Sequence, residues 1–409
     1  MDLRHVKLVG AATVLLGGAV NAQAGGFERN LQDFDILFEQ GNVVDTTATY
    51  VMPQRKLRNI HGSGIGAATG GINPLTGNPY STSVKEAQNY WVPKLSAKFD
   101  LTDDLACAAQ YRQPWGVHTD AGMDTVRMYV AIEQKIASHD YGLNCSYRFA
   151  AGEKGYFRIL GGVSYQEIRG EQTRLLPASN SLPFRVGTLD VEDNSIGWRI
   201  GAAYEIPEYA LRASLVYHSK LNYELEGNVG NIIPNTSVGV VGDVTTPQAV
   251  EFKFQTGIAP DWLAFGSVKW TNWSSVERIS FVNSTGMVYA GIFAPGQEIM
   301  ALNLFFRDGW TVSGGIGHKF DDQWSAAATL TWDRGTSTGL SVQTDTWMLG
   351  LGTNYKPAEQ FEIRLAGALG WLQSGKFDDR SVNLSGTGSA GDFGDDIVTA
   401  LSLTGKIKF

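Results

Sequence analysis

Apolar and polar residues alternate with a period of two along most of the chain, the pattern of β-strands that have one apolar face. Near the C-terminus, Ile397, Leu401 and Leu403 share one face of such a strand, and Ser402 and Lys406 share the other. Similar segments recur from about residue 47 to the end of the chain. The alternation therefore predicts an all-β protein.

Two classes of connection separate these segments. Short polar turns, such as 102–104 and 260–261, alternate with long connections rich in Gly, Ser, Asn and Asp, such as 60–89 and 227–247. Trp and Tyr residues gather at the strand ends. A soluble β-sandwich also alternates, but short turns, long loops and aromatic strand ends together are typical of a transmembrane β-barrel of the bacterial outer membrane.

The fold class predicted is a closed, transmembrane antiparallel β-barrel of about 14 strands, an even number as bacterial barrels require. Closure leaves no strand edge unpaired in hydrocarbon. The strands are predicted at residues 47–59, 90–101, 104–115, 128–149, 155–173, 194–206, 209–226, 248–259, 262–282, 298–320, 323–334, 344–356, 360–373 and 396–409.

The first residues have the features of a secretory signal. A short basic region containing Arg4 and Lys7 precedes the apolar stretch 8–20, and Ala22-Gln23-Ala24 forms an A-x-A cleavage site. We therefore expect residues 1–24 to be a signal peptide and residues 47–409 to form the barrel.

Residues 25–46 do not continue the alternation. They contain an apolar cluster that includes Phe34, Leu37 and Phe38, with Leu31, Phe34 and Phe38 at helical spacing. An apolar segment left in water is a liability. We expect a plug, or hatch, folded into the barrel lumen, and a periplasmic stub is the alternative.

Composition narrows the function. The 409 residues are 18% charged with a net charge of −8, which argues against a nucleic-acid partner. The chain has two cysteines and no residues at the spacing of a metal-binding motif, so no metal site is expected. No cofactor motif is present. An outer-membrane lipase is not expected, because no G-x-S-x-G occurs and the neighbouring His218 and Ser219 fall on opposite faces of a strand.

Several segments, in order, resemble the FadL-type long-chain fatty acid transporters: 197–204, 262–274, 306–310 and 320–324. The resemblance covers most of the chain after the signal peptide. It implies a fourteen-stranded barrel with an N-terminal hatch that carries hydrophobic ligands across the outer membrane. One segment departs from the family, since Gly41-Asn-Val-Val-Asp-Thr-Thr47 stands where the hatch usually carries Asn-Pro-Ala.

The predicted function is passive transport of hydrophobic compounds, long-chain fatty acids first, by a protein of the bacterial outer membrane. A general porin or a structural barrel is the alternative. The expected partners are hydrophobic small molecules such as fatty acids and hydrocarbons, together with outer-membrane lipid and lipopolysaccharide. The protein is expected to be a monomer.

Candidate ligand contacts are the apolar hatch residues Phe34, Leu37 and Phe38 and four arginines on the polar faces of strands. These arginines are Arg112, Arg199, Arg307 and Arg364. We expect all four to face the lumen, each with an acidic partner as the alternative role. Arg307, near the outer end of its strand, is predicted to meet a fatty-acid carboxylate.

The ligand is predicted to leave sideways through the wall near the first three strands, since an exit into lipid avoids exposing methylenes to water. Pro53 and Pro93 interrupt strand pairing there, and the small Ala106 and Ala108 leave room beside the backbone. A sealed wall with prolines at bulges is the alternative. Cys107 and Cys145 share the lipid-facing parity of adjacent strands and would form a disulfide if directly paired, with two free thiols as the alternative.

Overall fold

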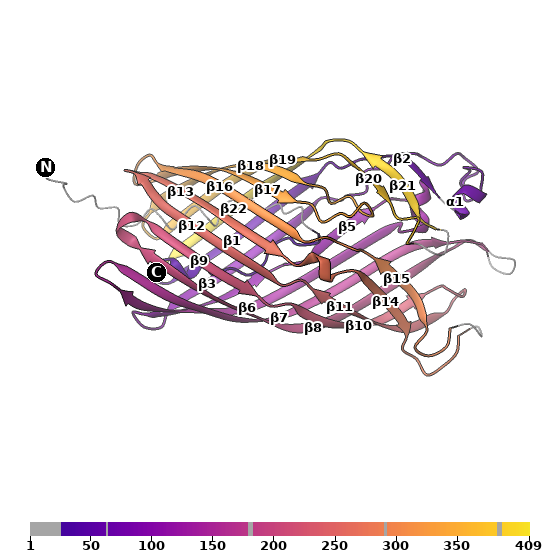
Figure 1. The fold of residues 1–409 in the computed structure, drawn as a ribbon, viewed down its shortest axis with the longest axis horizontal. Helices are drawn as coiled ribbons and strands as arrows, with labels where there is room; N and C mark the ends of the chain where they lie inside the picture. Colours follow the sequence, from indigo (N-terminus) through magenta and orange to yellow (C-terminus); the bar gives the residue numbers. More distant parts are fainter. Residues whose placement is uncertain (1–25, 63, 179–182, 290–292, 383–386) are drawn as a thin grey trace.

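The computed structural model describes residues 26–62, 64–178, 183–289, 293–382 and 387–409, so the predicted signal peptide lies outside the described residues. The chain forms a closed antiparallel barrel of 14 wall-spanning strands, as predicted. Because some of these strands are interrupted, each one is called a stave, whether it is continuous or made of two strands in line. Nine staves are single strands and five consist of two strands in line, and β22 closes the barrel on β1 (Figure 1).

The staves follow one another around the wall in chain order. In that order they are β1 (Val43–Pro53), β3 (Tyr90–Asp100), β4 (Leu105–Arg112) with β5 (Gly116–Asp120), β6 (Glu133–Ala151), β7 (Gly155–Leu176), β8 (Arg185–Ile206), β9 (Leu211–His218) with β10 (Leu221–Gly230), β11 (Ser237–Thr246) with β12 (Ala249–Ala259), β13 (Trp262–Thr271) with β14 (Arg278–Asn283), β15 (Glu298–Asn303) with β16 (Gly309–Lys319), β17 (Trp324–Arg334), β18 (Thr346–Ala358), β19 (Phe361–Leu372) and β22 (Asp396–Lys408).

A small second sheet lies at the end of the barrel that carries the long connections (Figure 1). It consists of β2 (Leu57–Gly62), β21 (Ser389–Phe393) and β20 (Gly375–Asp378), whose Leu57, Phe377 and Phe393 share a buried cluster. The described helices are short: η1 (Asp35–Phe38), α1 (Ile65–Ala68), η2 (Val126–Tyr129), η3 (Pro207–Tyr209) and η4 (Trp273–Ser275). None of the helices in the described ranges has the length and apolar character to cross a membrane.

The outer half of the barrel differs from the predicted spans. β11 lies within the predicted connection 227–247, and β8 begins at Arg185 rather than at residue 194. In this half the strands continue beyond the part of the wall whose outer face is apolar. On β11, Val238 and Val240 are buried, while the outward Asp243 is exposed. The outer face of this strand therefore lacks the apolar residues by which the sequence predicts a lipid-facing strand. Conversely, β1 ends at Pro53, and β2 leaves the wall for the small sheet.

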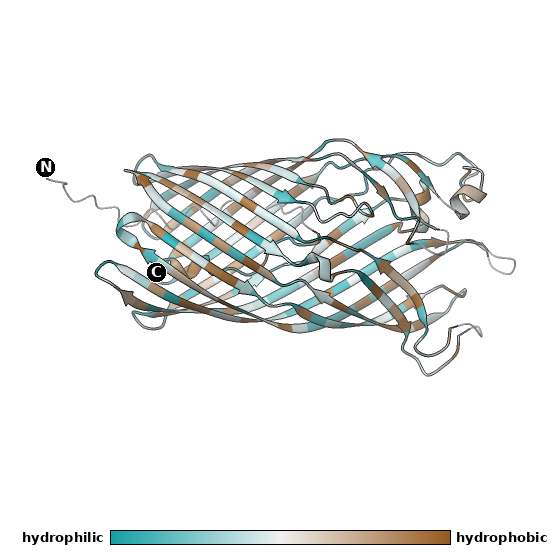
Figure 2. Cartoon of the chain, in the orientation of Figure 1, coloured by the Kyte–Doolittle hydropathy of each residue, from teal (hydrophilic) through white to brown (hydrophobic). Residues whose placement is uncertain are grey.

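The alternation orients the wall as predicted. On β22, Leu401 and Leu403 are 57% and 55% exposed on the outside, whereas Thr404 and Lys406 are buried on the inside. Figure 2 shows apolar and polar residues alternating along the strands of the wall. A row of tryptophans crosses neighbouring strands near one rim, with Trp347 paired in register to both Trp332 and Trp371. Such a row is typical of the membrane interface.

This orientation predicts that a charged substitution on the outer face destabilises the barrel more, the deeper it lies in the bilayer. Leu401→Arg places a charge in mid-bilayer and is expected to reduce the free energy of unfolding by roughly 2–4 kcal/mol. Ile397→Arg, on the same strand opposite Trp371, lies at the interface and is expected to cost about 1 kcal/mol or less. Urea titration of the protein refolded in phospholipid vesicles measures both. Equal losses for the two variants would contradict the assigned position of the bilayer.

Candidate functional site

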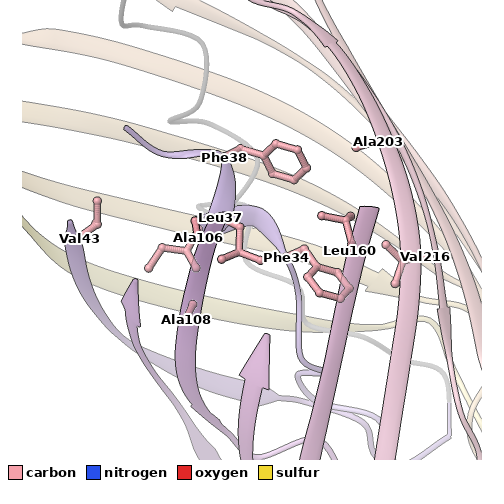
Figure 3. Packing of buried hydrophobic residues seen from close by; sticks show 10 residues of the cluster. Phe34, Leu37, Phe38, Val43, Ala106, Ala108, Leu160, Ala203 and Val216 are labelled. Atoms are coloured by element: carbon pink, nitrogen blue, oxygen red, sulfur yellow. The ribbon is translucent and has the colours of Figure 1, made fainter. Parts of the chain in front are cut away.

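The N-terminal segment, Gly26–Asn42, packs against lumen-facing residues of the wall. Phe34, Leu37 and Phe38 are 3%, 1% and 8% exposed, and they share a cluster with Ala106 and Ala108 of β4 (Figure 3). Ile36 of the segment and Val43, Leu160, Ala203 and Val216 of other strands also belong to it. Small residues at the two alanine positions leave space for the larger side chains of the segment.

Acidic residues tie the segment to cations on strands around the barrel. Asp33 lies 3.0 Å from Arg112 and 3.7 Å from Lys94, measured between carboxylate oxygen and nitrogen. The remaining pairs join Asp35 to Lys253, Glu28 to Lys269, and Glu39 to both Lys406 and Lys408. Buried ion pairs are poor evidence of net stability, but removal of one partner is costly. The pairs therefore hold the segment in one position.

Two of these carboxyl groups have pKa values below their usual range. Burial alone would raise the pKa of Asp33, but the cations Lys94, Arg112 and Lys253 more than offset it. Burial would likewise raise the pKa of Glu39. The positive charges of Lys406 and Lys408 outweigh this effect and lower the pKa of Glu39 to about 2. Both carboxylates are therefore ionised at neutral pH.

The third stave is interrupted between Arg112 and Gly116. Its pairing with β3 stops at Leu95↔Tyr111 and resumes in the same register at the isolated bridge Ala87↔Thr119. Between these points the stave bends into the lumen, where Trp115 is 3% exposed and its backbone N–H donates to Ser138 Oγ at 2.8 Å. We call this break, bounded by residues 90–94 and 112–116, the wall interruption.

The N-terminal segment forms hydrogen bonds with backbone groups of the third stave that the bend separates from β3. The Arg29 N–H donates to the Pro114 carbonyl at 2.7 Å, and the Gly116 N–H donates to the Phe27 carbonyl at 2.8 Å. Pro114 itself has no N–H to satisfy. The bend thus occurs at a proline and is satisfied by residues 27–29, which couples the segment to the wall.

The predicted wall residues divide into two groups. Pro93 lies at the wall interruption, on the β3 side. Pro53 does not, because it lies at the end of β1 and is in register with Val398. Ala106 and Ala108 also lie elsewhere, within the intact β3–β4 ladder opposite Asp100 and Lys98. Their small size serves the packing of the N-terminal segment, which corrects the prediction that they border an opening.

An almost wholly apolar cavity occupies the outer half of the lumen; we call it the apolar cavity. It encloses about 730 Å³ of empty space, open solvent included. Its wall combines residues of seven strands with three aromatic side chains from outside them. It includes Ile168, Leu189, Val191, Leu225, Ile279, Phe281, Leu302, Phe27, Trp115 and Trp273. A concave apolar lining with few polar groups is typical of a site for a hydrophobic ligand.

A second space, the outer cavity, adjoins it towards the small sheet. The two share Phe27, Gln134 and Gln172 among their lining residues. Arg174 lines the outer cavity and lies two residues beyond Gln172 on β7. Across the described part of the chain, Arg174 has no hydrogen-bond or ion-pair partner. The cation thus stands unpaired beside the mouth of the apolar cavity.

The four predicted arginines have other positions. Arg112, Arg199 and Arg364 do face the lumen, where they bind Asp33, the Asn144 and Ser164 side chains, and Glu362, respectively. Arg307 does not line the apolar cavity. It lies in the break between β15 and β16, donates to the Gly335 carbonyl and pairs with Asp345 at 3.3 Å. Arg307 thus lies outside a strand, where alternation does not apply, and its contact with a fatty-acid carboxylate stays a prediction.

The cysteines lie directly opposite each other on β4 and β6, and the structure joins Cys107 to Cys145 in a disulfide. This bond lies in the intact part of the third stave, on the periplasmic side of the wall interruption. It fixes β4 to β6 while leaving the other edge of the stave, towards β3, free of covalent links. No group of metal-ligating residues occurs in the ranges that the structure describes.

Comparison with known proteins agrees with this architecture. A family model for outer membrane protein transport proteins (OMPP1/FadL/TodX) matches residues 18–403. Among curated relatives, the long-chain fatty acid transport protein of Escherichia coli O6:H1 is 22% identical over 298 residues, 64% of either chain, so the match spans less than two thirds of that relative. The Salmonella typhi protein is 19% identical over 78% of this chain and 80% of its own.

Solved structures share the fold. A Pseudomonas aeruginosa FadL homologue matches with a TM-score of 0.78 at 16% identity over 92% of both chains. The Ralstonia pickettii toluene transporter TbuX matches with a TM-score of 0.59 at 13% identity, over 91% of this chain and 90% of its own. The protein is thus an outer-membrane β-barrel of the transport class, and it belongs to the OMPP1/FadL/TodX family.

The Glu39 cluster predicts a pH range for release of the segment. The folded pKa of about 2 lies below the ordinary value of 4.5, so the stabilisation is complete above pH 4.5 and is lost as pH falls towards 2. A nitroxide at the exposed Gln40 position, introduced as Gln40→Cys, should gain mobility in this range by electron paramagnetic resonance. Adding Glu39→Gln should give the mobile spectrum at pH 7. If the nitroxide were already fully mobile above pH 4.5, the result would contradict the assignment of Glu39 as the group that holds the segment.

Proposed function

We propose that the protein carries long-chain fatty acids, as carboxylates with apolar tails, inward across the outer membrane without energy input. The observation that carries this proposal is the unpaired Arg174 beside the apolar cavity. A neutral hydrocarbon needs no cation, and a partly buried cation without a partner is unfavourable unless a ligand compensates it. The fatty acid transport proteins among the relatives support the same ligand class.

The dimensions suit an acid with a tail. Two residues along a strand span about 7 Å, so Arg174 lies roughly one short step beyond Gln172 and the apolar lining. The carboxylate would accept hydrogen bonds from the guanidinium, which presents a planar fork suited to it. The tail would then enter between Leu189, Val191 and Phe281, gaining about 0.8 kcal/mol per buried methylene.

The N-terminal segment acts in this proposal as the plug. A general porin needs an open polar channel, whereas here Phe34, Leu37 and Phe38 fill the space between strands and six ion pairs hold the segment across the lumen. Movement of the plug would therefore accompany passage. The family's usual Asn-Pro-Ala position falls at the start of β1, which is wall rather than plug.

The exit we propose is lateral, through the wall interruption. Pro93 and Pro114 border it, and the backbone of residues 112–116 already bends away from β3. An apolar tail that passes here enters lipid without crossing water. We further expect a monomer in contact with lipopolysaccharide, since one chain closes the whole wall. That the chain catalyses no reaction stays a prediction.

Arg174→Gln tests the ligand class. Loss of a charge-assisted hydrogen bond, worth roughly 1.5–3 kcal/mol, should weaken palmitate binding at least tenfold. Binding of methyl palmitate, which lacks the charge, should stay unchanged. Isothermal titration calorimetry of the purified barrel measures both. Arg169→Gln, an exposed position on the same strand paired with Asp190, is the matched control. Equal weakening of acid and ester would refute the role of Arg174.

A cross-link over the wall interruption tests the exit. Cysteines at Pro93 and Gln113, joined by a bismaleimide, should abolish uptake of labelled palmitate into intact cells and leave binding unchanged. Cysteines at Leu95 and Tyr111, which pair directly in the intact ladder next to it, form the control and should leave uptake normal. Uptake that persists with the interruption bridged would rule out the lateral exit.

A further inference from the structure

A third space, which we call the polar cavity, lies between the N-terminal segment and the wall formed by β1, β3, β12 and β13. It encloses about 1260 Å³ of empty space, open solvent included. Unlike the apolar cavity it is lined by hydroxyls and charges, among them Thr49, Ser267, Lys94, Lys253 and Lys269. Tyr90, Val92 and Lys94 belong to its lining and also border the wall interruption.

Of the lysines and arginines that line the polar cavity, all but one form ion pairs among the described residues. Its three lysines each have a carboxylate partner: Lys94 pairs with Asp33, Lys253 with Asp35, and Lys269 with Glu28. Arg29 also lines this cavity, but it forms no ion pair with the residues that the structure describes, and its Nε is buried without a hydrogen-bond partner. Arg29 is therefore a cation without an anion.

Its place in the fold explains how this side chain is held. The guanidinium carbon of Arg29 lies 4.0 Å from the centre of the Tyr90 ring, a cation–π contact. On the other side it lies against Gly116, where a Cβ atom would come within 2.5 Å of Arg29 Nε. The absence of a side chain at Gly116 thus leaves room for Arg29 between β3 and the bent third stave, within the wall interruption.

We propose that Arg29 forms a second acid-binding position, at the wall interruption, which receives the carboxylate as the ligand passes out. The inference rests on the proposed function and adds a site to it. A carboxylate that leaves Arg174 for lipid would otherwise be unpaired in a medium that strongly disfavours an unpaired charge. Arg29 offers the same planar fork, and the Tyr90 ring holds it without consuming its donors.

The other charges of the cavity are consistent with this role. The carboxylates that line the cavity, Glu28, Asp33, Asp35 and Glu251, each pair with a lysine or with Arg112 and not with Arg29. A neutral ester would gain nothing at Arg29, since it brings no charge to pair. The site therefore distinguishes acids from their esters during exit rather than during capture.

The test compares Arg29→Met, which keeps the length of the side chain but removes its charge, with wild type and with Arg169→Gln, the exposed control position on β7. Initial uptake of labelled palmitate and of methyl palmitate is measured in intact cells, and palmitate affinity is measured on the purified full-length barrel. Arg29→Met should slow palmitate uptake roughly tenfold, as expected for a lost charged hydrogen bond. Methyl palmitate uptake and palmitate affinity should stay within twofold of wild type.

Three results would overturn the inference: unchanged palmitate uptake, equal slowing of acid and ester, or loss of palmitate affinity at equilibrium. Arg169→Gln should behave as wild type. If wild type itself neither binds nor carries palmitate, the proposed function fails instead, and this outcome is separate from the failure of Arg29. Heat-dependent migration in gels verifies that each variant is a folded barrel.

Discussion

Backbone hydrogen bonding in hydrocarbon is the constraint on which this structure depends. Lipid offers no partner for a free N–H or C=O, so the wall closes into a barrel in which β22 returns to β1. The wall interruption is compatible with this rule because residues 27–29 bond to Pro114 and Gly116 from the lumen. The N-terminal segment is therefore part of the wall's hydrogen bonding as well as a filling of its interior.

That double role links the proposed plug to the proposed exit. Phe27 lines the apolar cavity, Arg29 lines the polar cavity, and the backbone between them pairs with the bent stave. A ligand that displaces Phe27 thus disturbs the hydrogen bonds that satisfy the bend. The ion pairs of Asp33, Asp35 and Glu39 lie further along the segment and oppose its full release.

Much of the fold follows from the alternation of apolar and polar residues. It placed Leu401 towards lipid and Lys406 towards the lumen, and it gave the number of staves, because a half-buried strand shows its two faces directly. The same pattern placed Cys107 and Cys145 on one side of adjacent strands. It failed beyond the membrane, where β11 and the start of β8 have polar outer faces, and in the break that holds Arg307.

The cation beside the apolar cavity could not be predicted in this way. Arg174 lies where a long connection was expected, and its lack of a partner is a property of the assembled lumen rather than of neighbouring residues. Arg112, Arg199 and Arg364 illustrate the converse, since they face the lumen as expected yet are occupied by Asp33, Asn144 with Ser164, and Glu362.

The most direct test of the account is to identify what the apolar cavity holds. Lipid extraction and mass spectrometry of the purified protein should find about one fatty acid per barrel in wild type. Gly170 lines this cavity beside Val191, and Gly170→Phe would place an aromatic ring in it. The account predicts that this variant folds as a barrel and loses the fatty acid. Wild type without fatty acid, or equal amounts in both proteins, would contradict it.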